Sequence, residues 1–185
     1  MPTRRAANAR RAERRPGGVL RTQKPAESKA RPGRSHRAAL RPPRLRLTVQ
    51  IVSRAPNLPN TRLLRRWAKA ALLQDAVANF RIVDATEGRR LNRKFRGKDY
   101  ATDVLTFRYP ELRPLSGDIV LCAGVVRREA LERGIALDAH YAHLVVHGML
   151  HLQGFDHEHT RDARRMERME TEIIARLGYA DPYSV

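Results

Sequence analysis

Three histidines lie within one eleven-residue segment of the chain: His147, His151 and His157. His147 and His151 are four residues apart, a spacing that places two side chains on the same face of a helix. Gly154 follows, and glycine readily takes the left-handed conformation that ends helices. A chain that turns at Gly154 can bring His157 back as a third nitrogen ligand. The segment therefore predicts a helix and a tight turn built around a metal ion.

Three imidazoles that leave one position to water are typical of a catalytic zinc site, whereas structural zinc sites are usually closed by four protein ligands. Zinc in such a site lowers the pKa of bound water toward about 7, so the predicted chemistry is hydrolysis. The simpler interpretation is that these histidines pack or face solvent, because His140, His143 and His159 lie close by. The glycine and the third histidine favour the metal site, with one zinc ion per chain.

The spacing His-x3-His-x2-Gly-x2-His is that of the metzincin proteases, in which a glutamate directly after the first histidine is the general base. Here that position is Gly148, which has no side chain, and no later Met-turn is evident. A zinc metallopeptidase is therefore the less favoured hypothesis.

Positive charge is concentrated at the N-terminus. The net charge of the 185 residues is +18, and residues 1–44 contribute 14 Lys and Arg against two acids. This segment is rich in Arg, Ala and Pro and poor in apolar side chains, so it is predicted to be a disordered basic arm. An RNA-binding arm, an organellar targeting segment and translated sequence upstream of the true start are all compatible with it.

The remaining residues, 45–185, are enough for one domain with a proper core. Cys122 is the only cysteine, so no internal disulfide can form, and its apolar neighbours predict a buried thiol. The sequence has no apolar run long enough to span a membrane and no secretory signal among its first thirty residues. These features predict a cytoplasmic protein without a membrane partner.

Hydrophobic periodicity predicts strands first and helices later. The expected strands are residues 45–52, 80–84, 103–109 and 117–122, with the last two forming a hairpin. The expected helices are residues 61–73, 85–95, 125–133, 138–153 and 160–177, with Asp138 as the N-cap of the histidine helix. The apolar stripe of the last helix is interpreted as core packing. The predicted fold is α+β, a small mixed four-stranded sheet covered by helices.

The segment His147-Gly148-x2-His151-Leu152-x-Gly154-Phe155-Asp156-His157 resembles the signature of the YbeY-type rRNA maturation factors, which are metal-dependent endoribonucleases of the bacterial cytoplasm. Three further blocks agree: Leu91-Asn92 with Arg96-Gly97-Lys98-Asp99-Tyr100, then Thr102-Asp103-Val104-Leu105-Thr106-Phe107, and Gly117-Asp118-Ile119. The resemblance covers about residues 45–178. It does not extend to the basic arm.

The resemblance implies that His147, His151 and His157 bind zinc and that Arg96 is an essential basic residue near the metal. It also implies cleavage of single-stranded RNA, in 3′-end maturation of the 16S rRNA of the small subunit and in ribosome quality control. Ribosomes or ribosomal proteins are then the expected partners, and DNA is not. Chemistry supports Arg96 in part, because a guanidinium can bind two oxygens of a phosphate that gains charge during cleavage. The alternative is that Arg96 lies in a solvated loop.

Four other residues are open to two interpretations. Asp156 can orient a ligand imidazole by a hydrogen bond without binding the metal itself, or it can simply form the turn. His143 can likewise orient a ligand imidazole, or it can pack in the core. Asp103 and Asp118 are interpreted as structural. A second functional hypothesis is a ribosome-assembly factor that binds RNA and whose zinc is mainly structural. Cleavage of single-stranded RNA with and without a chelator distinguishes the two hypotheses.

Overall fold

The computed structural model describes residues 41–155 and 160–184. These residues fall in the second of two units into which the chain divides, Arg41–Val185. The first unit, Met1–Leu40, lies outside the described residues, as do the four residues 156–159 and residue 185. The predicted disorder of residues 1–44 thus stays a prediction. Residues 41–44 are exposed and lead into the first strand.

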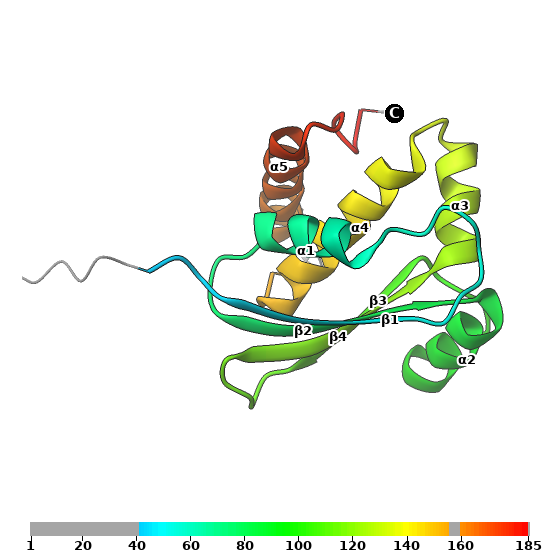
Figure 1. The fold of residues 1–185 in the computed structure, drawn as a ribbon, viewed down its shortest axis with the longest axis horizontal. Coiled ribbons are helices and arrows are strands. Elements are labelled where there is room, and N and C mark those ends of the chain that lie inside the picture. Colours follow the sequence, from blue (N-terminus) through cyan, green and yellow to red (C-terminus); the bar gives the residue numbers. More distant parts are fainter. Residues whose placement is uncertain (1–40, 156–159, 185) are drawn as a thin grey trace, which may run out of the picture. The chain divides into compact units, whose positions relative to one another are not determined.

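A mixed sheet forms one layer of the described domain (Figure 1). Within the described residues it has four strands, β1 (Leu45–Ile51), β2 (Ala76–Val83), β3 (Val104–Tyr109) and β4 (Leu115–Cys122), in the order β1-β2-β4-β3. β1, β2 and β4 are parallel to one another, and β3 pairs antiparallel with β4. The predicted mixed sheet and its hairpin are confirmed. β3 is an edge strand, which is important for the site described below.

The helices of the described residues are α1 (Thr61–Ala70), α2 (Ala85–Arg96), α3 (Ala123–Glu132), α4 (Leu137–Leu152) and α5 (Thr160–Leu177). α1, α4 and α5 lie over one face of the sheet, and α2 lies on the opposite side (Figure 1). The prediction of an α+β fold is confirmed.

The main core lies between the sheet and α4. β2 points alternate side chains toward the helices, and Ala76, Ala78, Phe80 and Ile82 are each no more than 1% exposed. α4 buries residues around most of its circumference, which is typical of a central helix. Its position is therefore fixed by packing on several sides, and the histidines that it carries are held with it.

Several predicted element boundaries differ from the structure, and β4 and α3 each begin two residues earlier than predicted, at Leu115 and Ala123. β2 begins at Ala76 rather than at residue 80. Its first residues were not predicted as strand because small alanines, which have weak β-propensity, fill its first inward positions. α1 ends at Ala70 rather than near residue 73. α4 begins one residue before Asp138, and its N-cap is Ala136, which makes no side-chain capping bond. Asp138 instead lies in the first turn, where a carboxylate still interacts favourably with the helix dipole.

Two features predicted from composition have counterparts in the structure. Cys122 is 2% exposed, and burial raises the pKa of its thiol, in agreement with the predicted buried cysteine. Among the residues that the structure describes, no helix combines the length and the apolar character needed to cross a membrane.

The hairpin register depends on Gly117. A Cβ atom at this position would lie 2.3 Å from the Phe107 carbonyl oxygen and 2.5 Å from Leu152 Cδ1. Gly117→Ala is expected to lower the free energy of unfolding by roughly 1–3 kcal/mol or more, because backbone on the neighbouring strand must move. Gly124→Ala is the matched control, since its Cβ would meet nothing closer than Ala85 Cβ at 3.9 Å. Denaturant unfolding of both variants measures the difference, and equal stability would contradict the account.

Candidate metal centre and its pocket

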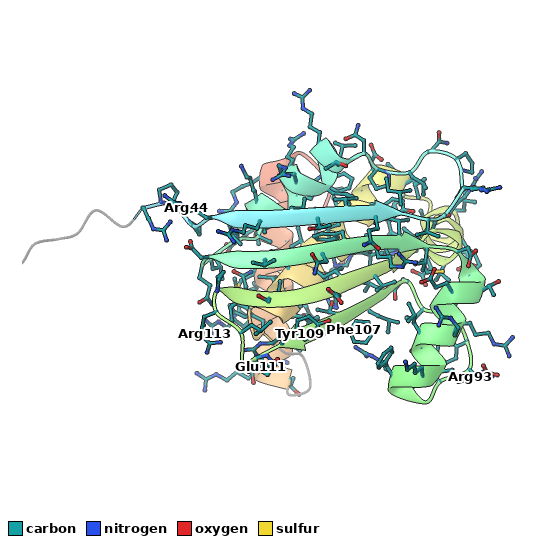
Figure 2. The ribbon with its side chains drawn as sticks, turned by 60° about the horizontal axis from the view of Figure 1, so that its bottom comes forward. Arg44, Arg93, Phe107, Tyr109, Glu111 and Arg113 are labelled. Carbon is teal, nitrogen blue, oxygen red and sulfur yellow. The ribbon has the colours of Figure 1, made fainter. Side chains whose placement is uncertain are left out.

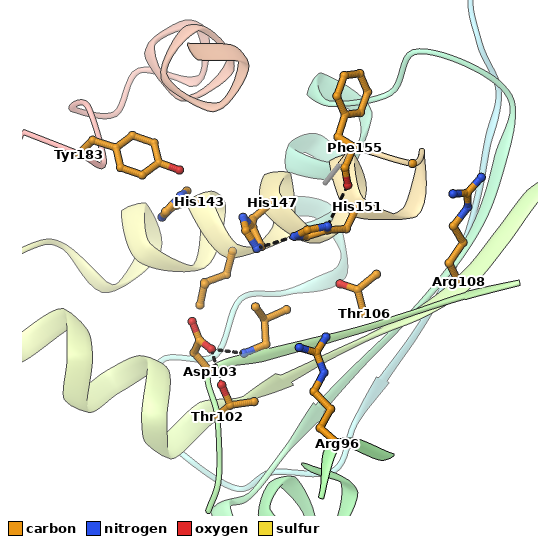
Figure 3. A pocket seen from close by; sticks show the side chains of 13 residues that line it. Arg96, Thr102, Asp103, Thr106, Arg108, His143, His147, His151, Phe155 and Tyr183 are labelled. Atoms are coloured by element: carbon orange, nitrogen blue, oxygen red, sulfur yellow. Dashed lines mark hydrogen bonds between the residues drawn. The ribbon is translucent and has the colours of Figure 1, made fainter. Parts of the chain in front are cut away.

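α4 presents three histidines, one per turn, to a single pocket of about 710 Å³ (Figure 3). They are His143, His147 and His151. The rings of His147 and His151 lie 4.5 Å apart between centroids, at an interplanar angle of 79°. Their Nε2 atoms are 3.0 Å apart. The four-residue spacing therefore brings the two imidazoles together as the sequence predicts.

The outer nitrogen of each ring faces an oxygen. His147 Nδ1 lies 2.8 Å from Glu170 Oε1, and His151 Nδ1 lies 2.9 Å from the carbonyl oxygen of Phe155. A carboxylate and a carbonyl only accept hydrogen bonds, so both Nδ1 atoms carry the proton and donate. In the neutral rings each Nε2 atom then carries the lone pair, and the two Nε2 atoms lie side by side. A shared cation stabilises such an arrangement.

The spacing of the two Nε2 atoms fits a metal ion. Two imidazole nitrogens bound at 2.0–2.1 Å to a tetrahedral zinc are roughly 3.3 Å apart, close to the observed 3.0 Å. The ring N–H of a metal-binding histidine is usually donated to a carboxylate or a backbone carbonyl. Both acceptors are present here, one for each ring. The donor chemistry of this pair therefore fits a metal such as zinc.

Glu170, on α5, is the buried charge of the site and is 1% exposed. Its oxygens accept hydrogen bonds from His147 Nδ1 and from the hydroxyl of Tyr183, and His143 Nε2 lies 3.6 Å from Oε2. Burial alone would raise the pKa of Glu170, but contacts with His143, His147 and Tyr183 outweigh it and hold the pKa at about 2. Glu170 is therefore a carboxylate at neutral pH.

One ligand atom from each of His143, His147 and Glu170 lies within 4.8 Å of the other two, close enough to hold a metal ion. Glu170 is, however, already accepting a hydrogen bond from His147 Nδ1. That bond leaves His147 Nε2 as the ring's metal-binding atom and places Glu170 behind it. His143 lines the pocket beside Glu170, and the Tyr183 ring lies 5.5 Å away, edge-on.

Sequence reasoning missed Glu170, although the sequence contained a signal for it. Met166, Ile173 and Leu177 form the apolar stripe of α5 and are buried. Glu170 falls on the same stripe, four residues after Met166 and three before Ile173. A carboxylate on a buried face requires a partner. Tyr183, which follows α5 and completes this group, carried no comparable signal.

Glu170→Gln is expected to weaken zinc binding by about 10–100-fold, the usual cost of losing a partner that orients a ligand. The amide keeps the size of the side chain but loses the charge that holds His147 Nδ1 protonated. Glu167→Gln, on the exposed side of the same helix, is the matched control. Competition with a chromophoric chelator measures both affinities. An unchanged affinity in Glu170→Gln would show that the carboxylate does not support the metal.

The predicted third ligand, His157, and the predicted orienting residue Asp156 lie outside the described residues. The turn that precedes them is described. α4 ends at Leu152, and Gly154 has a φ of +94°, the positive value that the sequence predicts there. A Cβ atom at Gly154 would also lie 3.0 Å from Arg108 Nη1. A substitution there would strain the backbone and would require the Arg108 side chain to shift.

The wall of the pocket that faces the histidines is basic and polar. Arg96, the last residue of α2, lines it together with Thr102, Asp103, Thr106 and Arg108 (Figure 3). Asp103 Oδ1 accepts hydrogen bonds from the Thr102 hydroxyl and from the backbone N–H of Val104, which holds the approach to β3. The structure thus brings Arg96 into the same pocket as His147 and His151, rather than into a loop remote from them.

Asp118 has a structural environment. It accepts hydrogen bonds from the Asn79 amide and from the Tyr109 hydroxyl, on the strands flanking β4. The bond to Asp118 raises the pKa of Tyr109 to about 12. Asp118 does not line the pocket of the histidines.

Gly148 explains why no glutamate follows the first histidine. It is buried where α4 crosses the sheet, and an added Cβ would lie 3.0 Å from Ile119 Cγ2 and 3.2 Å from Thr106 Oγ1. The position therefore faces the sheet at close approach and has no room for a general base. A metallopeptidase that uses a glutamate at this position as its general base is therefore not supported by the fold.

The family model described as "Endoribonuclease YbeY" matches residues 57–178, about two thirds of the chain. The chain belongs to the endoribonuclease YbeY family. Similar relatives include the endoribonuclease YbeY of Aromatoleum aromaticum, 58% identical over 76% of this chain and 94% of the relative. That of Methylobacillus flagellatus is 56% identical over 77% and 95%, and that of Nitrosomonas europaea is 58% identical over 75% and 85%.

Among solved structures, the solution structure of TM1509 from Thermotoga maritima matches with a TM-score of 0.49 and 25% identity. The match covers 77% of this chain and 100% of that one. The match to the family model and the identity to these curated relatives confirm the predicted family.

Proposed function

We propose that the protein is a zinc-dependent endoribonuclease specific for single-stranded RNA. The observation that carries the proposal is the pair of Nε2 atoms of His147 and His151, held 3.0 Å apart and facing a pocket lined by arginines. Each chain binds one zinc ion through His147, His151 and His157, the last inferred from the spacing of the motif. Membership of the endoribonuclease family supports RNA as the substrate.

The protein's own residues prepare the site in three ways. Glu170 and the Phe155 carbonyl fix the tautomers of His147 and His151, so both Nε2 atoms are offered to the metal. The Arg96 guanidinium, across the pocket, binds phosphate oxygens as negative charge grows on them. When bound, zinc supplies a Lewis acid and acidifies water.

The biological substrate proposed is the 16S rRNA of the small ribosomal subunit, matured at its 3′ end in the bacterial cytoplasm, with a role in ribosome quality control. Ribosomal proteins are the proposed protein partners. The resemblance of the motif blocks and the family membership support this assignment.

The test compares three conditions on the same zinc-verified protein: single-stranded RNA, the same RNA annealed to its complement, and single-stranded RNA with a chelator. Cleavage is expected only in the first condition and is expected to return when zinc is added back. Tight RNA binding without cleavage, at a stoichiometric zinc content, would instead support an assembly factor with a structural metal.

The basic arm is proposed to strengthen RNA binding without taking part in the reaction. Arg41 and Arg44 already contact Asp75 within the described unit, through Nη2 at 2.5 Å and the backbone N at 2.8 Å respectively. A deletion should therefore stop at residue 40. Loss of residues 1–40, which hold 12 Lys and Arg and two acids, is expected to weaken RNA binding about equally for all sequences and to flatten its salt dependence.

Equilibrium binding across a salt series measures this effect, and the cleavage rate at saturating RNA is the control that should change little. Loss of cleavage at saturation would place the arm in the active site.

A further inference from the structure

The end of α2 and the loop after it alternate cations with exposed aromatic rings, in the order Lys94-Phe95-Arg96-Gly97-Lys98-Asp99-Tyr100. Phe95 and Tyr100 are each 55% exposed, unusual for aromatic side chains that have a core beside them. The loop is held in place, because buried Asn92 donates from Nδ2 to the Tyr100 carbonyl oxygen at 2.8 Å. The two rings are therefore exposed on a fixed backbone.

Phe95 is supported from one side and open on the other. Its ring meets that of Phe107 edge to face, with centroids 4.9 Å apart and an interplanar angle of 63°. Lys94 Nζ lies 5.1 Å from the centre of the Phe95 ring. The support of a second ring limits the motion of Phe95 and leaves part of its surface to solvent.

This aromatic surface and the metal pocket lie on two sides of one edge strand. Phe107 is flanked on β3 by Thr106 and Arg108, which both line the pocket. Neighbouring side chains on a strand point to opposite faces, so Phe107 points away from the pocket, toward the side on which α2 lies (Figure 2). Arg96, adjacent to Phe95 in the chain, reaches into the pocket. An extended nucleic-acid strand that crosses the edge of β3 would therefore contact both the aromatic surface and the metal pocket.

The cations beside the rings are uncompensated. Asp99 pairs with Arg89 at 2.7 Å and with Arg93 at 3.9 Å, so the only carboxylate of residues 94–100 is already engaged. Within residues 41–155 and 160–184, Lys94, Arg96 and Lys98 form no ion pair with a carboxylate. Three free positive charges interleaved with two exposed rings suit a polyanion that carries flat groups.

We propose that Phe95 and Tyr100 form a base-stacking platform for the nucleotides that flank the cleaved phosphate, with Lys94 and Lys98 contacting the backbone. The proposal rests on the proposed function, because it assigns the RNA of that same site. Only unpaired bases present their faces to such rings, so the platform selects single strands. Stacking tolerates any base, so it adds affinity with little sequence preference.

The test uses the full-length, zinc-loaded protein and a short single-stranded RNA that contains 2-aminopurine, whose fluorescence is quenched by stacking. The rapid quench in stopped-flow mixing reports binding before cleavage. Phe95→Leu and Tyr100→Leu are each expected to weaken binding on the order of tenfold or more. Leu131→Ala, which alters a 73% exposed residue of α3, is the control and should bind as the unchanged protein does.

An oligonucleotide of equal length whose sugars carry no bases separates stacking from phosphate binding. Its affinity is measured by competition with the fluorescent RNA. The two variants should bind this base-free chain as well as the unchanged protein does. Equal losses on both oligonucleotides, or no loss on either, would overturn the platform. Zinc-dependent cleavage with normal binding by both variants would overturn the platform alone. Quenching without any cleavage would overturn the proposed function and leave the platform standing.

Discussion

Arg96→Ala is expected to slow cleavage at saturating RNA by on the order of a hundredfold or more, the typical cost of losing one preorganised donor to the transition state. Arg96 faces the histidines across the pocket, and no carboxylate within the described residues neutralises it. Its guanidinium is therefore available to the charge that develops during the reaction. RNA affinity in the ground state should fall much less than the rate. Zinc content should stay at one per chain.

Two further variants make this result specific. Arg96→Lys should recover only part of the rate, because a single ammonium cannot reproduce a two-pronged contact with phosphate oxygens. Arg62→Ala removes one positive charge from an exposed position on α1, outside the pocket, and should leave the rate unchanged. Single-turnover cleavage beside equilibrium binding measures both quantities. A loss confined to affinity, with the saturated rate intact, would make Arg96 an ordinary phosphate-binding residue.

His151→Ala is expected to lose the metal and, with it, cleavage. The substitution removes one of the two Nε2 atoms that face each other 3.0 Å apart. The thermal midpoint of the zinc-loaded protein should also fall, because a ligand at 100 times its Kd stabilises the native state by about 2.7 kcal/mol. Elemental analysis after gel filtration and a thermal melt with and without zinc measure these effects.

His140→Gln is the matched control for His151→Ala. His140 lies on the same helix, is 3% exposed and contacts Glu129 Oε2 through Nε2 at 3.0 Å, and it does not line the metal pocket. Its replacement should cost stability with and without zinc but should leave one zinc per chain. Stoichiometric zinc retained in His151→Ala would contradict the ligand assignment.

The sequence was most informative where the chemistry is local. His147, His151 and Gly154 lie within two turns of chain, so helical spacing alone predicts that the two rings meet and that the helix ends in a turn. The N-cap of α1 is of the same short-range kind, because the Asn60 side chain accepts a hydrogen bond from the backbone N–H of Leu63, three residues on. The family signature added RNA cleavage, which spacing alone cannot supply.

What residue spacing alone could not place is set by contacts between distant parts of the chain, and only the family resemblance placed Arg96 near the metal. Arg96 is 51 residues before His147 and reaches the pocket only because α2 leads into the edge strand β3 beneath α4. Glu170 comes from α5, and its role depends on how that helix packs against α4. Tyr183, beyond the last helix, reaches Glu170 in the same way. Such packing follows from the tertiary fold and not from local pattern.

The most direct test of the account is a zinc titration of metal-free protein, with single-turnover cleavage of single-stranded RNA followed at each point. The facing Nε2 atoms of His147 and His151 predict that cleavage is absent without metal, rises in proportion to added zinc and levels off sharply at one zinc per chain. Cleavage at full rate by verified metal-free protein would contradict it, as would zinc bound at one per chain with no gain in cleavage.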